Sequence, residues 1–278
     1  MRITIDGTDA DIRIEEERTL GDVLAALDTW LGSCGRRICG IGVDGRELGA
    51  SAVTECFRRE VVSVETLALR TGSVFELLAE CLHEALAALD DYRAADFRER
   101  ESLAVKWEDG PAAGMLAEQR PELSLRMRET LRGGGQGPES LAGELRLHLA
   151  ELADPVGQLE EAGPEVRKLA DRLEAFPLDV QTGRRERAAE TVAAFSSMAG
   201  KVLRIAGILK GYGVPGNEGR IRETEEREGE FHLCLTRMLD AFARGDMVLA
   251  GDLAEYDLAP KLRALHVGVL ELGKGAVQ

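Results

Sequence analysis

Apolar and polar residues alternate along the first part of the chain. Ile3 and Ile5 are each flanked by polar residues, which is the period of a strand with one buried face. Residues 6–9 have the composition of a tight turn, and Ile12 and Ile14 continue the alternation beyond them. Residues 1–15 therefore predict a β-hairpin.

The period becomes helical after residue 18. Thr19 and Asp22 have the spacing of a capping box, in which each side chain bonds the other residue's backbone N–H, so we expect a helix from residue 20. Apolar residues then recur three and four positions apart and share one helical face: Leu20, Val23, Leu24, Leu27, Trp30 and Leu31.

Two more strands follow this helix in the prediction. The first contains Ile38, Ile41 and Val43 and ends in an Asp44-Gly45 turn, and the second is the β-branched run 60–69. The resulting order of hairpin, helix, strand, turn and strand resembles the ubiquitin-like β-grasp fold. The resemblance covers about a quarter of the chain and implies a β-grasp module in residues 1–72.

Every later segment has helical periodicity, so residues 73–278 are predicted to form an all-helical region, in an α+β protein overall. This region could divide near 133–138, which is rich in glycine, or near 177–183, whose composition predicts a loop. We expect one helix across 112–131 and a helix break at Gly163-Pro164. A heptad seam predicts an antiparallel bundle: Ala188, Val192, Phe195, Ala199, Val202, Ala206 and Leu209.

Charge and composition narrow the classes of partner. The 278-residue chain has a formal net charge of −15 and only 4% aromatic residues. Nucleic acids and anionic membranes select a concentrated positive face, and single-stranded nucleic acid also needs stacking aromatics, so neither is expected as a partner. The N-terminus lacks the pattern of a signal peptide, and we expect a cytoplasmic protein with five reduced cysteines.

No motif in the sequence predicts catalysis, a metal or a cofactor. Cys34 and Cys39 have no second pair, and Glu80 with His83 is a lone helical carboxylate–histidine motif. A β-grasp sulfur carrier or protein modifier exposes a Gly-Gly carboxyl tail. The predicted module instead continues through Thr71-Gly72-Ser73 into a helix, and residues 274–278 lack the pair.

One group of residues near the end of the chain predicts a binding surface. Asp252, Glu255, Tyr256 and Asp257 precede Pro260, and they combine an aromatic residue and carboxylates with an interrupted helix. This run and residues 179–183 resemble segments of uncharacterised bacterial proteins. We expect a non-enzymatic adaptor or chaperone-like protein that binds another protein or itself, in the latter case as a homodimer. The alternative is an enzyme or metal-binding helical protein with a pocket between helices.

Overall fold

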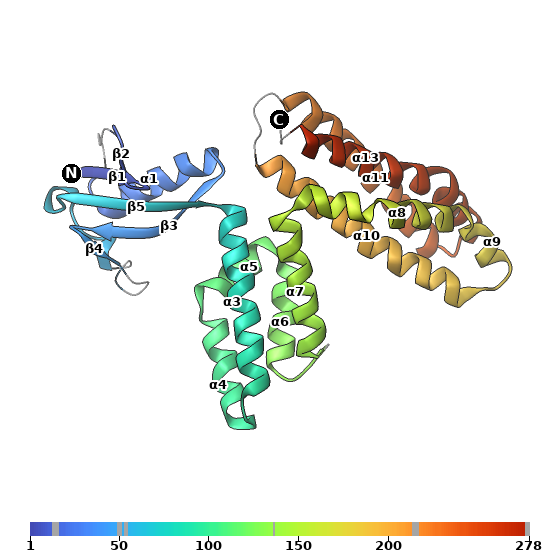
Figure 1. Cartoon of the computed structure of the whole chain (residues 1–278), viewed down its shortest axis with the longest axis horizontal. Coiled ribbons are helices and arrows are strands. Elements are labelled where there is room, and N and C mark those ends of the chain that lie inside the picture. The colour runs from blue at the N-terminus through green and yellow to red at the C-terminus, as the bar shows by residue number, and fades with distance from the viewer. Residues whose placement is uncertain (13–16, 49–51, 53–54, 136, 213–216, 276–278) are drawn as a thin grey trace. The chain divides into compact units, whose positions relative to one another are not determined.

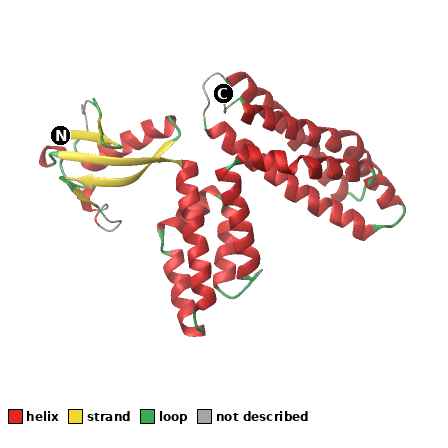
Figure 2. Cartoon of the chain, viewed as in Figure 1, coloured by secondary structure: helices red, strands yellow, loops and turns green. Residues whose placement is uncertain are grey.

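A five-stranded mixed sheet with one helix forms the N-terminal part of the computed structural model, which describes residues 1–12, 17–48, 52, 55–135, 137–212 and 217–275 (Figures 1 and 2). The strands are β1 (Arg2–Ile5), β2 (Thr8–Asp9), β3 (Arg36–Val43), β4 (Arg46–Glu47) and β5 (Thr66–Ser73), in the order β2-β1-β5-β3-β4. β1 runs parallel to β5 with Ile3 opposite Leu67, and β3 runs antiparallel to β5 with Ile41 opposite Leu69.

Two Asp-Gly turns join the antiparallel pairs β1–β2 and β3–β4 of this sheet. Asp6 and Gly7 have φ values of 50° and 79°, and Asp44 and Gly45 have 51° and 78°. Positive φ at both central residues is the type I′ geometry that closes two-residue hairpins. The first hairpin is confirmed, with a second strand of two residues, and Ile14 lies outside the described residues.

Helix α1 (Leu20–Ser33) begins with the predicted Thr19–Asp22 capping box. Its apolar face packs on the sheet in one core with Ile3, Val43, Leu67 and Leu69. Trp30 was wrongly placed on that face, because its position is 54% exposed. The last strand also begins later than predicted, since Val61–Ser63 form a 3-10 turn, labelled η1, with Val62 in solvent.

The rest of the chain is helical, which confirms the α+β class. The first group contains α3 (Val74–Ala94), α4 (Phe97–Glu108), α5 (Pro111–Gln119), α6 (Pro121–Leu131) and α7 (Pro138–Ala153). Ser73 ends β5 and caps α3 through a second capping box with Glu76. The single helix expected across 112–131 is wrong, because Pro121 starts a new helix after Arg120.

The second group contains α8 (Pro155–Glu174), α9 (Phe176–Gln181), α10 (Arg185–Gly211), α11 (Glu218–Ala243), α12 (Met247–Asp252), the π-helical turn η2 (Leu253–Leu258) and α13 (Ala259–Lys274). The break predicted at Gly163-Pro164 is wrong, since α8 continues through Pro164. The loop predicted for 177–183 is also wrong at its start, where α9 forms.

The backbone contacts divide the chain into two compact units, residues 1–148 and 149–278, with the boundary inside α7. The predicted module boundary at 72/73 falls inside the first unit, between β5 and α3. The predicted division near 133–138 includes residue 136, which lies outside the described residues. The domain assignment from the sequence stays a prediction.

The second unit has its own continuous core. α13 packs against α8, α10 and α11, and the core includes Phe195, Val202, Phe231 and Leu262. Residues Glu186–Gly211 of α10 are long and apolar enough to cross a membrane by length and composition alone, with 39% of the most apolar window buried inside the structure. Core helices of soluble proteins have the same composition, and much of the predicted heptad seam faces this core.

Candidate functional surfaces

The predicted binding residues lie where α12 passes into α13. Ala259 donates its N–H to the carbonyl of Ala254, five residues earlier, which is the hydrogen bond of a π-helix. Pro260 follows at once and has no N–H to donate. The extra residue in this turn shifts the side chains relative to a regular α-helix, so the sequence correctly indicated an irregular helix at this place.

The structure brings three of the four predicted residues together. Tyr256 is 68% exposed, and its hydroxyl bonds to the Glu255 carboxylate. This bond, together with the charges of Glu255 and Asp252, raises the pKa of Tyr256 because the phenolate would be repelled. The Tyr256 hydroxyl is thus a neutral donor beside two carboxylates at physiological pH.

Asp257 lies on a different side of the turn. Its charge acts on Cys234 of α11 and Lys261 of α13. Lys261 donates to Glu230 at 2.8 Å, and this bond, with a smaller contribution from Asp257, raises the pKa of Lys261. Asp257 therefore belongs to the contact between α11 and α13, and the expectation that it shares one surface with Tyr256 is not what the geometry shows.

Exposed apolar residues extend this surface, and the sequence reasoning missed them. Val248 of α12 is 69% exposed, and Leu178 of α9 is 55% exposed. α9 and α12 are in contact, because a Cβ on Gly251 would lie 3.1 Å from Cβ of Pro177. The signal was available in Met247-Val248-Leu249, since a helix cannot bury three consecutive apolar side chains on one face. We call Leu178, Met247, Val248, Leu249, Asp252, Glu255 and Tyr256 the α12–η2 surface.

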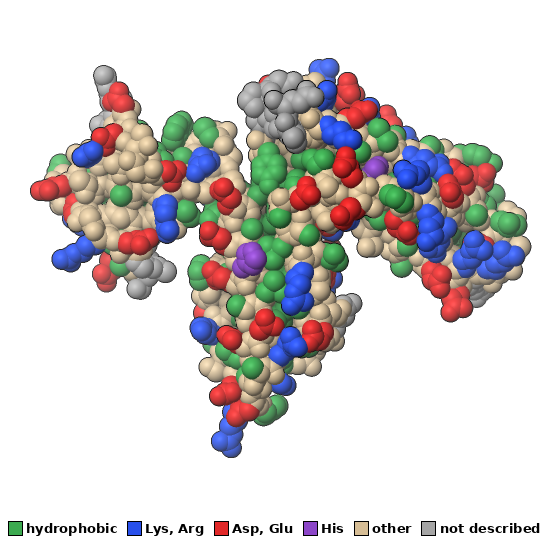
Figure 3. Space-filling model, in the orientation of Figure 1, with side chains coloured by type: hydrophobic (Ala, Val, Ile, Leu, Met, Phe, Trp, Pro, Cys, Tyr) green, Lys and Arg blue, Asp and Glu red, His purple; other side chains and the backbone are tan. Residues whose placement is uncertain are grey.

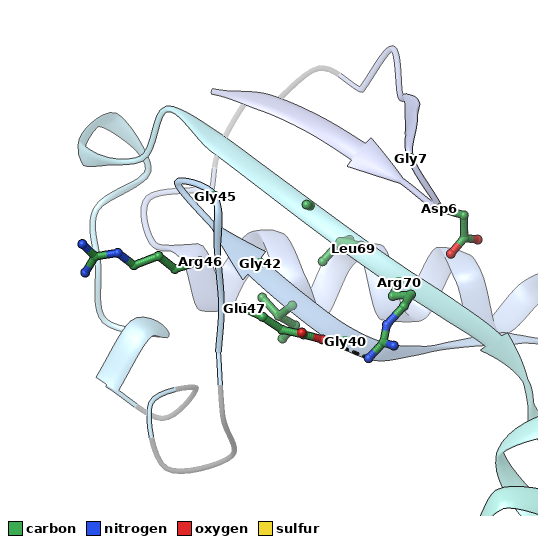
Figure 4. Close-up of a pocket in the computed structure, with 11 residues that line it drawn as sticks. Asp6, Gly7, Gly40, Gly42, Gly45, Arg46, Glu47, Leu69 and Arg70 are labelled. Atoms are coloured by element: carbon green, nitrogen blue, oxygen red, sulfur yellow. Dashed lines mark hydrogen bonds and ion pairs between the residues drawn. The ribbon is translucent and has the colours of Figure 1, made fainter.

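A second candidate is a hollow of about 610 Å³ on the open face of the sheet (Figure 4). Gly40 and Gly42 of β3 form its floor, where the absence of side chains exposes the backbone. The Arg70 side chain lies over Gly40 and donates to Glu47 at 3.0 Å. Two polar residues of the rim are thus paired with each other, and the Arg70 side chain covers part of the floor.

A third candidate is a groove of about 680 Å³ between α4 and the end of α6. Phe97, which is 90% exposed, and Val105 line it together with Tyr92. The Arg100 guanidinium lies 4.9 Å from the centre of the Tyr92 ring, in a cation–π contact. Arg132 makes a bidentate ion pair with Glu108 at its rim.

The charged residues do not assemble into a metal site among the described residues, where no group of three or more His, Cys, Asp or Glu side chains could hold an ion. His83 is exposed, and His266 bonds through Nε2 to the carbonyl of Leu159 at 2.8 Å inside the core. On the face shown in Figure 3, acidic and basic side chains are interspersed.

Comparison with known proteins gives one family match, to the N-terminal part of the chain. Residues 1–73 match the family described as TP0873 N-terminal domain. Over 278 residues the chain is 24% identical to an uncharacterised protein of Treponema pallidum (strain Nichols), and the match covers 99% of each chain. No solved structure matches the chain. The similarity to this relative therefore extends beyond residues 1–73 through the rest of the chain.

Proposed function

We propose that this chain is a non-enzymatic protein-interaction protein of the cytoplasm, and that its principal binding surface is the α12–η2 surface. The observation that carries the proposal is Tyr256, an aromatic residue 68% exposed on a π-helical turn. π-Helical turns occur frequently at functional sites, and tyrosine is enriched among the residues that dominate binding energies.

The surroundings of Tyr256 support this proposal. Val248 and Asp252 are four residues apart in α12 and therefore share a face, and Tyr256 follows on the next turn. An apolar group, a carboxylate and an aromatic ring thus lie in sequence along one exposed strip. Such a strip suits a folded protein partner better than a small molecule, because it is a surface and not an enclosed pocket.

We also infer that residues 1–72 are a ubiquitin-like β-grasp module that serves as a second, auxiliary interaction part. The strand order β2-β1-β5-β3-β4, with β1 and β5 parallel at the centre and α1 on one face, supports this inference. The chain continues from Ser73 directly into α3, so the module has no free carboxyl end at this point.

The test is affinity capture from a lysate of the source cells, followed by binding measurements with each purified candidate. The full chain is compared with a variant that combines Tyr256→Ala, Asp252→Asn and Glu255→Gln, three substitutions that all lie on the α12–η2 surface. We expect binding to weaken about tenfold or more, since hot-spot truncation costs more than roughly 1.4 kcal/mol, while the melting temperature stays nearly unchanged.

A matched control is Phe97→Ala, which removes another exposed aromatic ring from the α4 groove. We expect this variant to bind like the unmodified chain. Loss of binding in Phe97→Ala with normal binding in the triple variant would move the surface to the α4 groove. A chain that binds neither another protein nor itself contradicts the proposal.

A further inference from the structure

We infer that the partner of the α12–η2 surface is a second copy of this chain, docked about a two-fold axis that passes near Val248. This inference rests on the proposed function and specifies the partner. It follows from three adjoining parts of the second unit: an apolar centre, an acidic flank and a basic flank.

The apolar centre is formed by α12 and α9. Val248 is 69% and Leu178 is 55% exposed, with Met247 and Leu249 at 39% and 38%. The Pro177–Gly251 contact fixes α9 against α12, and Leu178 follows Pro177 directly. Desolvation of these side chains would provide the non-directional part of the binding energy.

The acidic flank follows the apolar centre along the same helical path. Asp252 lies one turn after Val248, and Glu255 and Tyr256 lie on the next turn. Among the described residues, neither Asp252 nor Glu255 has a basic side chain within 4.0 Å, although Glu255 accepts the Tyr256 hydroxyl hydrogen bond. Two carboxylates are therefore available to basic groups of a partner.

The basic flank adjoins the apolar centre through α9. Asp179, the residue after Leu178, is almost fully buried and receives two guanidinium groups, from Arg187 at 3.2 Å and Arg184 at 3.5 Å. Both arginine side chains remain about half exposed, at 52% and 54%. Two cations on one carboxylate leave a net positive charge at the surface of a chain whose total charge is −15.

This combination is complementary to itself. A two-fold axis through the apolar centre brings Val248 near its own equivalent and sets the acidic flank of each copy opposite the basic flank of the other. A partner with only basic groups would match Asp252 and Glu255 but would meet Arg184 and Arg187 with like charge. A second copy satisfies both flanks, and this is why we choose it over an unrelated basic protein.

The first experiment is sedimentation velocity of the full chain over a dilution series. The unmodified protein should show a reversible dimer. Val248→Arg should weaken it about tenfold or more, because two guanidinium groups would meet near the axis. The matched control is Val267→Arg on α13, where the valine is 51% exposed and outside the proposed interface. This control should dimerise normally.

The second experiment tests the charge pairing. One variant carries Asp252→Lys and Glu255→Lys, and the other carries Arg184→Glu, which leaves Arg187 to hold Asp179. Each variant alone should dimerise poorly, because its two flanks carry charges of one sign. An equimolar mixture should form the heterodimer, and added salt should weaken it. Circular dichroism and melting of each variant show whether the second unit remains folded.

The results separate this inference from the proposed function. A chain that stays monomeric at every concentration, or a dimer that Val248→Arg leaves intact, overturns the inference. If such a monomer binds a different protein and loses that protein with Tyr256→Ala, the proposed function stands without it. If the two charge variants fail to restore each other although both are folded, the two-fold arrangement is overturned.

Discussion

The five cysteine thiols differ in exposure, and this difference should control their reactivity. Cys34 and Cys39 are exposed, whereas Cys56, Cys81 and Cys234 are buried. Burial raises the pKa of Cys81 and Cys234, so these two side chains form little of the reactive thiolate at neutral pH. All five are free thiols in the structure.

We therefore expect a thiol reagent to modify the two exposed cysteines quickly in the native protein and the three buried ones only after denaturation. Mass spectrometry of the alkylated protein, prepared without reductant, counts and locates the labels. Rapid labelling of Cys81 or Cys234 under native conditions would contradict this expectation, and so would a stoichiometric metal or a disulfide that protects Cys34 and Cys39.

Asp6 connects the first turn of the sheet to the end of β5. Its carboxylate accepts the Thr71 hydroxyl at 2.7 Å and the Thr71 N–H at 2.8 Å, and the Arg36 guanidinium lies at 3.1 Å. These bonds, those from Thr71 first, hold the pKa of Asp6 below its ordinary value. A carboxyl group whose pKa is lower in the folded state than in the unfolded state, where it is about 3.9, stabilises the fold at pH values above that. This stabilisation is lost as the pH falls through the folded-state pKa.

Asp6→Asn should consequently lower the melting temperature at neutral pH. The difference from the unmodified chain should shrink as the pH falls through the lowered pKa of Asp6, because the native carboxyl group is then itself protonated. Asparagine tolerates the φ of 50° at this position, so the backbone of the turn is retained. Asp11→Asn, at an exposed position outside this network, is the control. A loss of stability that is the same at all pH values would contradict the ionic explanation.

At the scale of elements, local signals predicted helix starts better than helix interruptions. Thr19 and Asp22 form the capping box expected from their spacing, and Ser73 with Glu76 forms another that the same rule would have found. Prolines were harder to interpret. Pro121 begins a helix, but Pro164 lies inside one, on its exposed side, where water can satisfy the carbonyl that loses its donor. Which side of a helix faces solvent depends on tertiary packing.

Close helix packing in the second unit leaves no room for a side chain at Gly273. A Cβ there would lie 2.7 Å from Cγ2 of Val156 and 3.1 Å from Cδ1 of Leu209. Both neighbours are held by their own helices, so Gly273→Ala should destabilise the unit by about 1–3 kcal/mol.

Gly268→Ala on the same helix is the matched control. The atoms in its way belong to the end of the flexible Arg227 side chain, which can move aside. This substitution should be nearly neutral or slightly stabilising, because alanine favours helix by up to about 1 kcal/mol over glycine. Urea unfolding followed by circular dichroism compares the two. Equal losses for both variants would show that the Val156–Leu209 contact does not govern packing at this end of α13.

At the scale of the whole molecule, the sequence predicted the chemical character of the candidate surface but not its full extent. Tyr256, Asp252 and Glu255 could be found because Pro260 indicated an irregular helix. Leu178 could not, because its place beside α12 depends on a contact between segments more than 70 residues apart. Asp257 was misplaced for a related reason, since a π-helical turn changes the angle between successive side chains.

The final prediction concerns which part of the chain self-associates. The core of the second unit draws its members from residues 159–272, and Glu151 joins it through a bidentate pair with Arg204 at 2.7 and 2.8 Å. A fragment of residues 149–278 should therefore fold alone, as judged by helical circular dichroism and cooperative melting.

Removal of residues 1–72, or of residues 1–148, should leave the dimer seen by sedimentation velocity intact, because all the residues of the α12–η2 surface and the basic flank lie within the second unit. A fragment starting at residue 155 lacks Glu151 and leaves Arg204 without this carboxylate. Its free energy of unfolding should therefore be lower by about 1–2 kcal/mol, and its melting temperature lower as well. It should still dimerise. If a folded 149–278 fragment is monomeric while the full chain is a dimer, the association surface lies in the first unit, and the sheet hollow and the α4 groove become the places to find it.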